Sequence, residues 1–92
     1  MKRYTVKWTT TFKKDYKSAK KRGLDINLLK EVVLMLSENT PLPAKFRDHS
    51  LHGDWIGYRE CHIQPNWLLL YRVEDDTLVL TLFRTGTHSD IF

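Results

Sequence analysis

The chain contains a single cysteine, Cys61, among its 92 residues. An internal disulfide is therefore excluded, and secreted domains of this size usually depend on several such bridges for their stability. Proline and glycine are scarce too, with three and four copies, and no repeat, linker or low-complexity tract divides the chain. These absences predict one domain, residues 1–92, in a reducing and therefore cytoplasmic compartment.

Long hydrophobic runs are also missing. The longest apolar stretches, residues 32–36 and 67–71, are far shorter than a membrane-spanning helix, which needs about 20 apolar residues. The basic N-terminus, from Met1 to Lys7, is not followed by the apolar segment that a signal peptide requires. We therefore expect neither a signal peptide nor a membrane anchor.

Positive charge is concentrated at the start of the chain. Residues 1–24 carry nine Lys or Arg against Asp15 alone, whereas residues 25–92 carry six against ten acids. The net charge of +4 therefore combines a segment of +8 with a remainder of −4. A basic element on a small domain is typical of nucleic-acid binders, because cationic contacts release the counterions condensed on phosphates. The same charges also fit a solvated helix surface that only keeps the protein soluble.

The basic segment has the periodicity of a helix. Phe12, Tyr16 and Ala19 recur at spacings of four and three, with lysines around them, after a threonine cluster that can supply the N-cap. Gly23 suits the end of this helix, and Asp25 can cap a second helix with an apolar face of its own. The two helices are expected to form a hairpin.

Strands flank this hairpin. Four strands are indicated, at residues 4–8, 55–63, 67–74 and 77–85. Apolar and polar residues alternate in the first, and the last three are rich in aromatic and β-branched residues. The links between the last three are so short that they can join only antiparallel neighbours, so these strands form a meander. The predicted fold is α+β, an antiparallel sheet made of the N-terminal strand and a C-terminal three-stranded meander, covered on one face by the helical hairpin.

The meander brings distant residues to one edge of the sheet. The end of its first strand, the start of its second and the end of its third share that edge, and the outer two strands lie only about 10 Å apart. Four polar residues stand at or just beyond these points: His62, Asn66, Arg84 and His88. His49 and His52 precede the first of these strands, at the opposite edge, and strand geometry does not bring them to the cluster.

Two histidines and an arginine suit the cleavage of RNA by its own 2′-hydroxyl group. That reaction needs a base for the hydroxyl proton, an acid for the leaving 5′-oxygen and donors for the charged phosphorane. Histidine can serve as base and acid because its ordinary pKa is about 6.5, and the guanidinium of Arg84 can bind two phosphate oxygens. A single histidine is more often structural than catalytic, so it is the convergence of His62, His88 and Arg84 that favours a catalytic site.

Other chemistries lack their motifs. The pairs Cys61–His62 and His49–His52 match no common zinc spacing, and adjacent residues of a strand point to opposite faces. The sequence contains no Gly-rich phosphate loop and no serine nucleophile elbow. We therefore expect an enzyme that uses neither a metal ion nor another cofactor.

The second half of the chain resembles a known family. The segments Asp48–Leu51, Gly53–Glu60, His62–Tyr71 and Arg84–His88 are similar to those of YafQ-type mRNA interferase toxins of the RelE/ParE superfamily, and the similarity extends over essentially the whole chain. The resemblance implies a RelE-like toxin that cleaves mRNA in the ribosomal A site. It also implies roles in cleavage for His49, His62 and His88 and for the terminal Phe92. An aromatic ring there could stack on a base or simply pack on the sheet.

One turn departs from the family's pattern. It usually reads Pro-Asp-Trp, but here it is Pro65-Asn66-Trp67, and an amide cannot exchange a proton as a carboxylate does. Asn66 is therefore either a weakened member of the catalytic site or a residue that suits a tight turn. The family commonly lacks a histidine at position 52, which leaves His52 outside the site.

The resemblance also implies partners. A cognate antitoxin would fold a flexible segment over the toxin, and operator DNA would be bound only through that antitoxin. The mRNA would be met on the ribosome, whose RNA would contact the basic first helix through Lys13, Lys17, Lys20 and Lys21. Two other functions stay open: a ParE-like toxin that acts on DNA gyrase without catalytic histidines, and an attenuated toxin that serves mainly in antitoxin binding and operon control.

Overall fold

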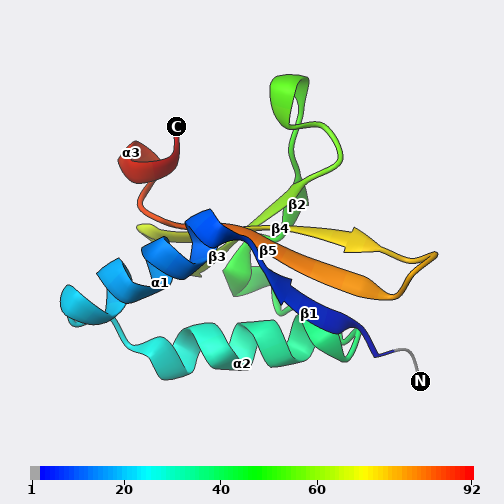
Figure 1. Ribbon diagram of the computed structural model, residues 1–92, viewed down its shortest axis with the longest axis horizontal. Coiled ribbons are helices and arrows are strands. Elements are labelled where there is room, and N and C mark those ends of the chain that lie inside the picture. Colours follow the sequence, from blue (N-terminus) through cyan, green and yellow to red (C-terminus); the bar gives the residue numbers. More distant parts are fainter. Residues whose placement is uncertain (1–2) are drawn as a thin grey trace.

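Residues 3–92, the part of the chain that the computed structural model describes, form a five-stranded sheet with helices on both faces (Figure 1). The strands are Thr5–Trp8 (β1), His49–Ser50 (β2), Arg59–Gln64 (β3), Trp67–Glu74 (β4) and Val79–Gly86 (β5). The helices are Thr10–Lys21 (α1), Ile26–Ser37 (α2) and His88–Ile91 (α3), with short 3-10 helices at Ala44–Phe46 (η1) and Gly53–Trp55 (η2). The strand order is β1-β5-β4-β3-β2.

The predicted meander is present, but the sheet is mixed. Strands β3, β4 and β5 are antiparallel to one another, whereas β1 lies parallel to β5. The expectation of a wholly antiparallel sheet was therefore wrong for β1. Both helices of the hairpin and three strands intervene between β1 and β5, so no short turn dictates the direction of this pairing.

The first meander strand starts later than predicted. It begins at Arg59 rather than near Trp55, because residues 53–55 form a 3-10 turn. Gly53 and Gly57 adopt positive φ angles of 64° and 93° there, a backbone conformation that residues with a β-carbon rarely adopt. The segment before β3 is consequently a folded loop.

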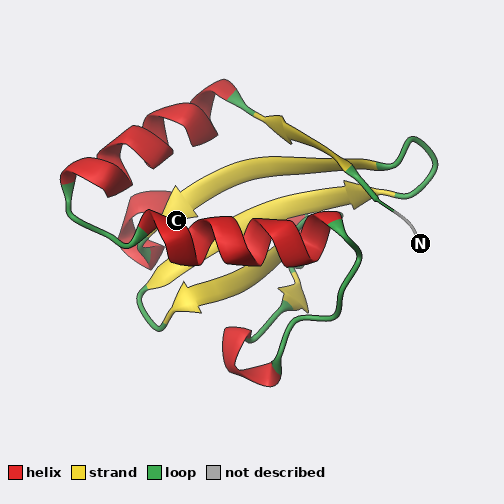
Figure 2. Ribbon diagram, turned by 90° about the horizontal axis from the view of Figure 1, so that it is seen from below, coloured by secondary structure: helices red, strands yellow, loops and turns green. Residues whose placement is uncertain are grey.

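The helical hairpin forms as the sequence predicts. The hydroxyl oxygen of Thr9 accepts a hydrogen bond from the Phe12 N–H at 3.0 Å, and Asp25 caps α2 by accepting from the Asn27 N–H at 3.1 Å. In Figure 2, α2 lies across one face of the sheet and α1 runs along its β1 side. Buried side chains from helices and strands meet in one cluster, which includes Phe12, Ala19, Leu29, Val32, Cys61, Ile63, Trp67, Leu69, Tyr71, Leu80 and Leu82. Burial raises the pKa of the Cys61 thiol, which identifies it as a core residue and not a nucleophile.

The opposite face of the sheet carries a second, smaller apolar cluster. Leu68 and Leu70 of β4 pack there against Ile91 of α3, beside the partly buried Leu51, Trp55 and Phe83. Figure 1 shows α3 on this side of the sheet and α2 on the other. The prediction of a sheet covered on one face was thus incomplete, and the added layer holds α3 against β4. No helix within residues 3–92 has the length and apolar character needed to cross a membrane.

Candidate active site

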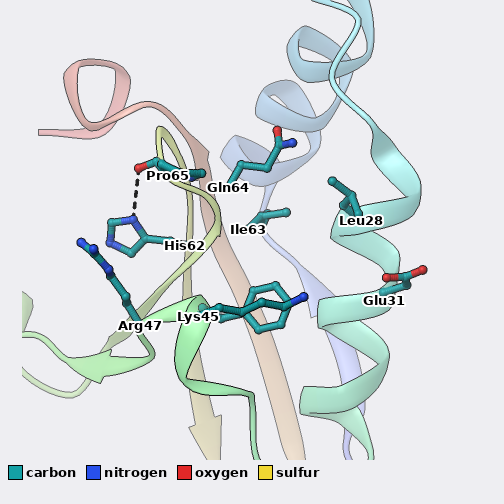
Figure 3. A pocket seen from close by; sticks show the side chains of 9 residues that line it. Leu28, Glu31, Lys45, Arg47, His62, Ile63, Gln64 and Pro65 are labelled. Carbon is teal, nitrogen blue, oxygen red and sulfur yellow. Dashed lines mark hydrogen bonds between the residues drawn. The ribbon is translucent and has the colours of Figure 1, made fainter.

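The turn between β3 and β4 orients the ring of His62. Its Nδ1 lies 3.2 Å from the carbonyl oxygen of Pro65 (Figure 3). A carbonyl oxygen can only accept, so this contact assigns a hydrogen to Nδ1. The other ring nitrogen, Nε2, faces the carboxylate of Glu60, 3.5 Å from Oε1. Nε2 is therefore the atom of His62 that can take up or release a proton.

Strand β2 brings His49 to the same carboxylate. His49 pairs with Glu60 across β2 and β3, and its Nε2 also lies 3.5 Å from Glu60 Oε1. Its Nδ1 lies 2.7 Å from the carbonyl oxygen of Arg47, so the hydrogen of this ring is assigned to Nδ1 as well. The centroids of the His49 and His62 rings are 6.4 Å apart. The expectation that strand geometry leaves His49 away from His62 was therefore wrong, because β2 has only two residues and periodicity cannot reveal so short a strand.

Glu60 is a member of this site that sequence reasoning missed. Its side chain is only 8% exposed, and one oxygen serves two histidines. A ring that carries both hydrogens can donate one to this oxygen, while a neutral ring offers Nε2 as an acceptor. A signal was present in the sequence, since Glu60 and His62 are two positions apart on one strand and so share a face.

His88 lies on the other side of His62. Both line a pocket of about 450 Å³, together with Asn66, as the meander geometry predicts. His88 is the first residue of α3, whose N-cap Thr87 forms a reciprocal capping box with Asp90. A short helix pinned at its first turn thus presents this histidine to the pocket.

A salt bridge anchors α3 to the first helix. The guanidinium of Arg22, at the end of α1, lies 2.8 Å from Asp90 Oδ2. Together with the N–H and hydroxyl groups of Thr87, Arg22 holds the pKa of Asp90 well below its usual range. The position of His88 is therefore coupled to α1 through a charged contact.

Phe92 is placed beside His88. The two ring centroids are 4.8 Å apart, and Phe92 and Trp55 form a T-shaped pair with a centroid distance of 5.6 Å. Phe92 is still 47% exposed. The ring thus packs against two side chains of the protein and keeps an exposed surface that can stack on another ring. Trp55, which supports it, was not among the predicted site residues.

Arg84 does not share the histidine pocket. Its Nε and Nη2 donate to the two carboxylate oxygens of Asp15 at 2.8 and 3.2 Å. This pair lines a separate cavity of about 210 Å³ that has no lining residue in common with the His88 pocket. Strand β1 pairs only with Val79–Leu82, and Asp15 of α1 accepts from the backbone N–H of Thr85 farther along β5. The expected convergence of Arg84 with the two histidines is therefore not found.

Comparison with known proteins adds the family. A model of bacterial toxins of type II toxin-antitoxin systems, YafQ, matches residues 4–92. The chain belongs to the YafQ family. It is 43% identical over 88 residues to the mRNA interferase toxin YafQ of Escherichia coli K12. The aligned residues cover 95% of this chain and 94% of that toxin.

Solved YafQ-family structures share the fold. A chain of the E. coli DinJ-YafQ toxin-antitoxin complex matches with a TM-score of 0.89 at 41% identity over 98% of both chains. A metal-bound toxin from Helicobacter pylori matches with a TM-score of 0.92 at 39% identity, over 97% of this chain and 99% of that one. In the present chain, within residues 3–92, no group of three or more His, Cys, Asp or Glu side chains is arranged to hold a metal ion. The mixed α+β architecture is thus that of a RelE-like YafQ toxin.

The structure also places Asn66 and the four lysines that were predicted to bind RNA. Asn66 is exposed and lines the pocket of His62 and His88. The lysines predicted to contact RNA are all exposed on α1: Lys13, Lys17, Lys20 and Lys21.

Proposed function

We propose that this toxin is an endoribonuclease that cleaves mRNA in the ribosomal A site of the bacterial cytoplasm. The observation that carries the proposal is the placement of His62 and His88 on one pocket, with His49 held to the same carboxylate as His62. The name of the E. coli relative, an mRNA interferase, supports the same activity. Cleavage would stop translation, and a cognate antitoxin would neutralise it, as in the DinJ-YafQ complex.

The RNA supplies the nucleophile. A neutral imidazole accepts the proton of a ribose 2′-hydroxyl, and the 2′-oxygen attacks the adjacent phosphorus. The bond from phosphorus to the 5′-oxygen then breaks, and an imidazolium donates its proton to that oxygen. The products are a 2′,3′-cyclic phosphate and a free 5′-hydroxyl. His62 and His88 share these two roles across the pocket, and His49 and Glu60 hold His62 in a polar environment that can stabilise its charged form during the reaction.

The charged phosphorane needs hydrogen-bond donors. Asn66, Thr87 and Ser89 line the pocket and supply an amide and two hydroxyl groups. Arg84 can add its guanidinium only if it leaves Asp15. Phe92 would stack on a codon base beside His88, a contact worth about 1–3 kcal/mol.

Surfaces outside the pocket would bind the macromolecular partners of the toxin. The exposed lysines of α1 would bind ribosomal RNA phosphates, and operator DNA would be contacted only through the antitoxin.

A second function, an attenuated toxin that serves mainly in antitoxin binding and operon control, is favoured by one observation, the amide of Asn66 in the histidine pocket. The convergence of the histidines argues against a gyrase toxin, which would not require them.

Cleavage of mRNA on purified ribosomes tests the proposal. We expect the wild type to release fragments with 5′-hydroxyl ends, and each of His49→Ala, His62→Ala and His88→Ala to cleave about 100-fold more slowly or worse, as loss of a general acid or base requires. His88→Ala should still bind the antitoxin. Three alanine variants that cleave like the wild type would remove the ribonuclease mechanism, and DNA damage without mRNA loss in arrested cells would support the gyrase alternative.

A further inference from the structure

A second pocket adjoins His62. It has a volume of about 440 Å³ and shares only His62 and Pro65 with the lining of the pocket that holds His88. His62 therefore stands between two cavities, of which the proposed reaction uses one. Pockets that bind small ligands have volumes of about 300–1,000 Å³, so the second cavity is large enough for a nucleoside.

The wall of this second pocket is apolar. Leu28 of α2 and Ile63 of β3 line it (Figure 3), together with Phe46 of η1. Phe46 packs against the main core and is partly exposed, and the ammonium group of Lys45 lies 5.1 Å from the centroid of its ring. A flat aromatic surface next to a cation suits a nucleobase, because bases stack on aromatic rings with little regard to sequence.

The mouth of the pocket is positively charged overall, because two cations outnumber the one acidic lining residue, Glu31. Lys45 and Arg47 line it, and Figure 3 shows the Arg47 side chain beside the ring of His62. Neither side chain has an ion-pair partner in the described part of the chain, residues 3–92, whereas Arg22 and Arg84 each bind an aspartate. An unpaired guanidinium next to a proposed catalytic histidine is well placed to bind a phosphate oxygen.

The backbone ties this mouth to the active site. Arg47 adopts a left-handed conformation with φ of 48°, its N–H bonds to the Ala44 carbonyl at 3.0 Å, and its own carbonyl oxygen holds the ring of His49. The Arg47 side chain therefore projects from a residue whose backbone is hydrogen-bonded to the ring of His49. A phosphate bound by Arg47 is therefore held at a defined position beside the ring of His62.

We propose that the second pocket is a nucleotide subsite of the ribonuclease. The nucleoside next to the scissile phosphate, on the side of His62 away from His88, places its base against Phe46 and Leu28, and Arg47 and Lys45 bind the phosphate beside it. This inference rests on the proposed function, since it assigns the substrate of the same site. It makes the loop of residues 44–47 a determinant of which nucleotide is preferred.

The test uses ribosomes programmed with mRNAs whose A-site codons differ in one nucleotide. Single-turnover cleavage is measured against toxin concentration for the wild type, Phe46→Leu and Arg47→Gln, with Lys7→Gln as a control that removes one exposed positive charge outside both pockets. We expect Phe46→Leu and Arg47→Gln to raise the half-saturating concentration about fivefold or more, as loss of a stacking or phosphate contact predicts. The maximal rate should fall much less, and the nucleotide preference should weaken with Phe46→Leu.

The outcomes separate the two proposals. A wild type that does not cleave would overturn both. A wild type that cleaves, with Phe46→Leu and Arg47→Gln keeping its nucleotide preference and half-saturating concentration, would overturn the subsite alone. Loss of antitoxin binding in these variants with unchanged cleavage would also overturn it, because the pocket would then bind protein. Arg47 is exposed and outside the core, so Arg47→Gln keeps the test valid even if Phe46→Leu fails to fold.

Discussion

Arg84 and Asp15 form a two-point ion pair that joins β5 to α1, with both side chains largely shielded from solvent. Asp15 is the only acidic residue among the first 24, in a segment with nine positive charges. Its carboxylate also accepts from the Thr85 N–H at 3.2 Å. The carboxylate of Asp15 thus accepts hydrogen bonds from two donors, the backbone N–H of Thr85 and the guanidinium of Arg84. This guanidinium lies outside the histidine pocket.

The first prediction follows from that pair. Replacing Asp15 with Asn removes the charge that Arg84 binds, and hydrogen bonds to charged groups contribute about 1.5–3 kcal/mol. We expect the free energy of unfolding to fall by about that amount, measured by urea denaturation at neutral pH. Glu38→Gln is the matched control, because it breaks the exposed Arg3–Glu38 pair, which should contribute less than about 1 kcal/mol. Equal stability of the two variants would show that the pair does not hold α1 to β5.

A second prediction concerns Glu60. Glu60→Gln preserves shape but cannot attract an imidazolium of His49 or His62. Because misplacement of catalytic groups is costly, we expect ribosome-dependent cleavage to slow by a factor on the order of 10 to 100, with a changed pH-rate profile that a purely structural residue would not alter. The exposed Glu74→Gln serves as control. A profile identical to that of the wild type would show that Glu60 does not act through the histidines.

Much of the fold follows from local rules, and the exceptions have a common cause. Thr9 and Asp25 cap the helices as expected, and the short links after β3 and β4 force the meander that brings His62 and His88 to one pocket. These predictions depend on near neighbours in the sequence. The parallel pairing of β1 with β5 and the contact between Arg84 and Asp15 link residues about 70 positions apart, and tertiary packing decides them.

The salt bridge at α3 leads to a third prediction. In Arg22→Gln the carboxylate of Asp90 loses its cation, so its pKa should rise toward the ordinary value of about 3.9. A carboxyl group with a lowered pKa stabilises the fold above its unfolded pKa and loses that contribution as the pH falls through the folded pKa. The wild-type α3 should therefore remain anchored to lower pH than α3 of Arg22→Gln, as NMR titration of Asp90 and His88 would show. Superimposable titrations would mean that Arg22 does not anchor α3.

Chelation provides a fourth prediction. The proposed proton transfers use imidazole groups alone, and the described residues 3–92 contain no cluster of three or more ligand side chains arranged for a metal ion, although a related toxin is described as metal-bound. The intact ribosome requires magnesium, so the assay uses a short RNA at high toxin concentration with EDTA. We expect cleavage to persist in EDTA and to disappear in His88→Ala. Loss of cleavage in EDTA, restored by a divalent ion, would contradict the metal-free mechanism.

The last prediction concerns Asn66. In Asn66→Asp a carboxylate enters the pocket of His62 and His88, where it can bind an imidazolium and exchange a proton. Since general acid–base groups contribute about 10²–10⁴ in rate, we expect ribosome-dependent cleavage to accelerate at least about tenfold. Asn27→Asp adds the same charge to an exposed position on α2, outside this pocket, and should leave the rate unchanged. If Asn66→Asp cleaves no faster than Asn27→Asp, position 66 serves the turn between β3 and β4, and the amide does not attenuate this toxin.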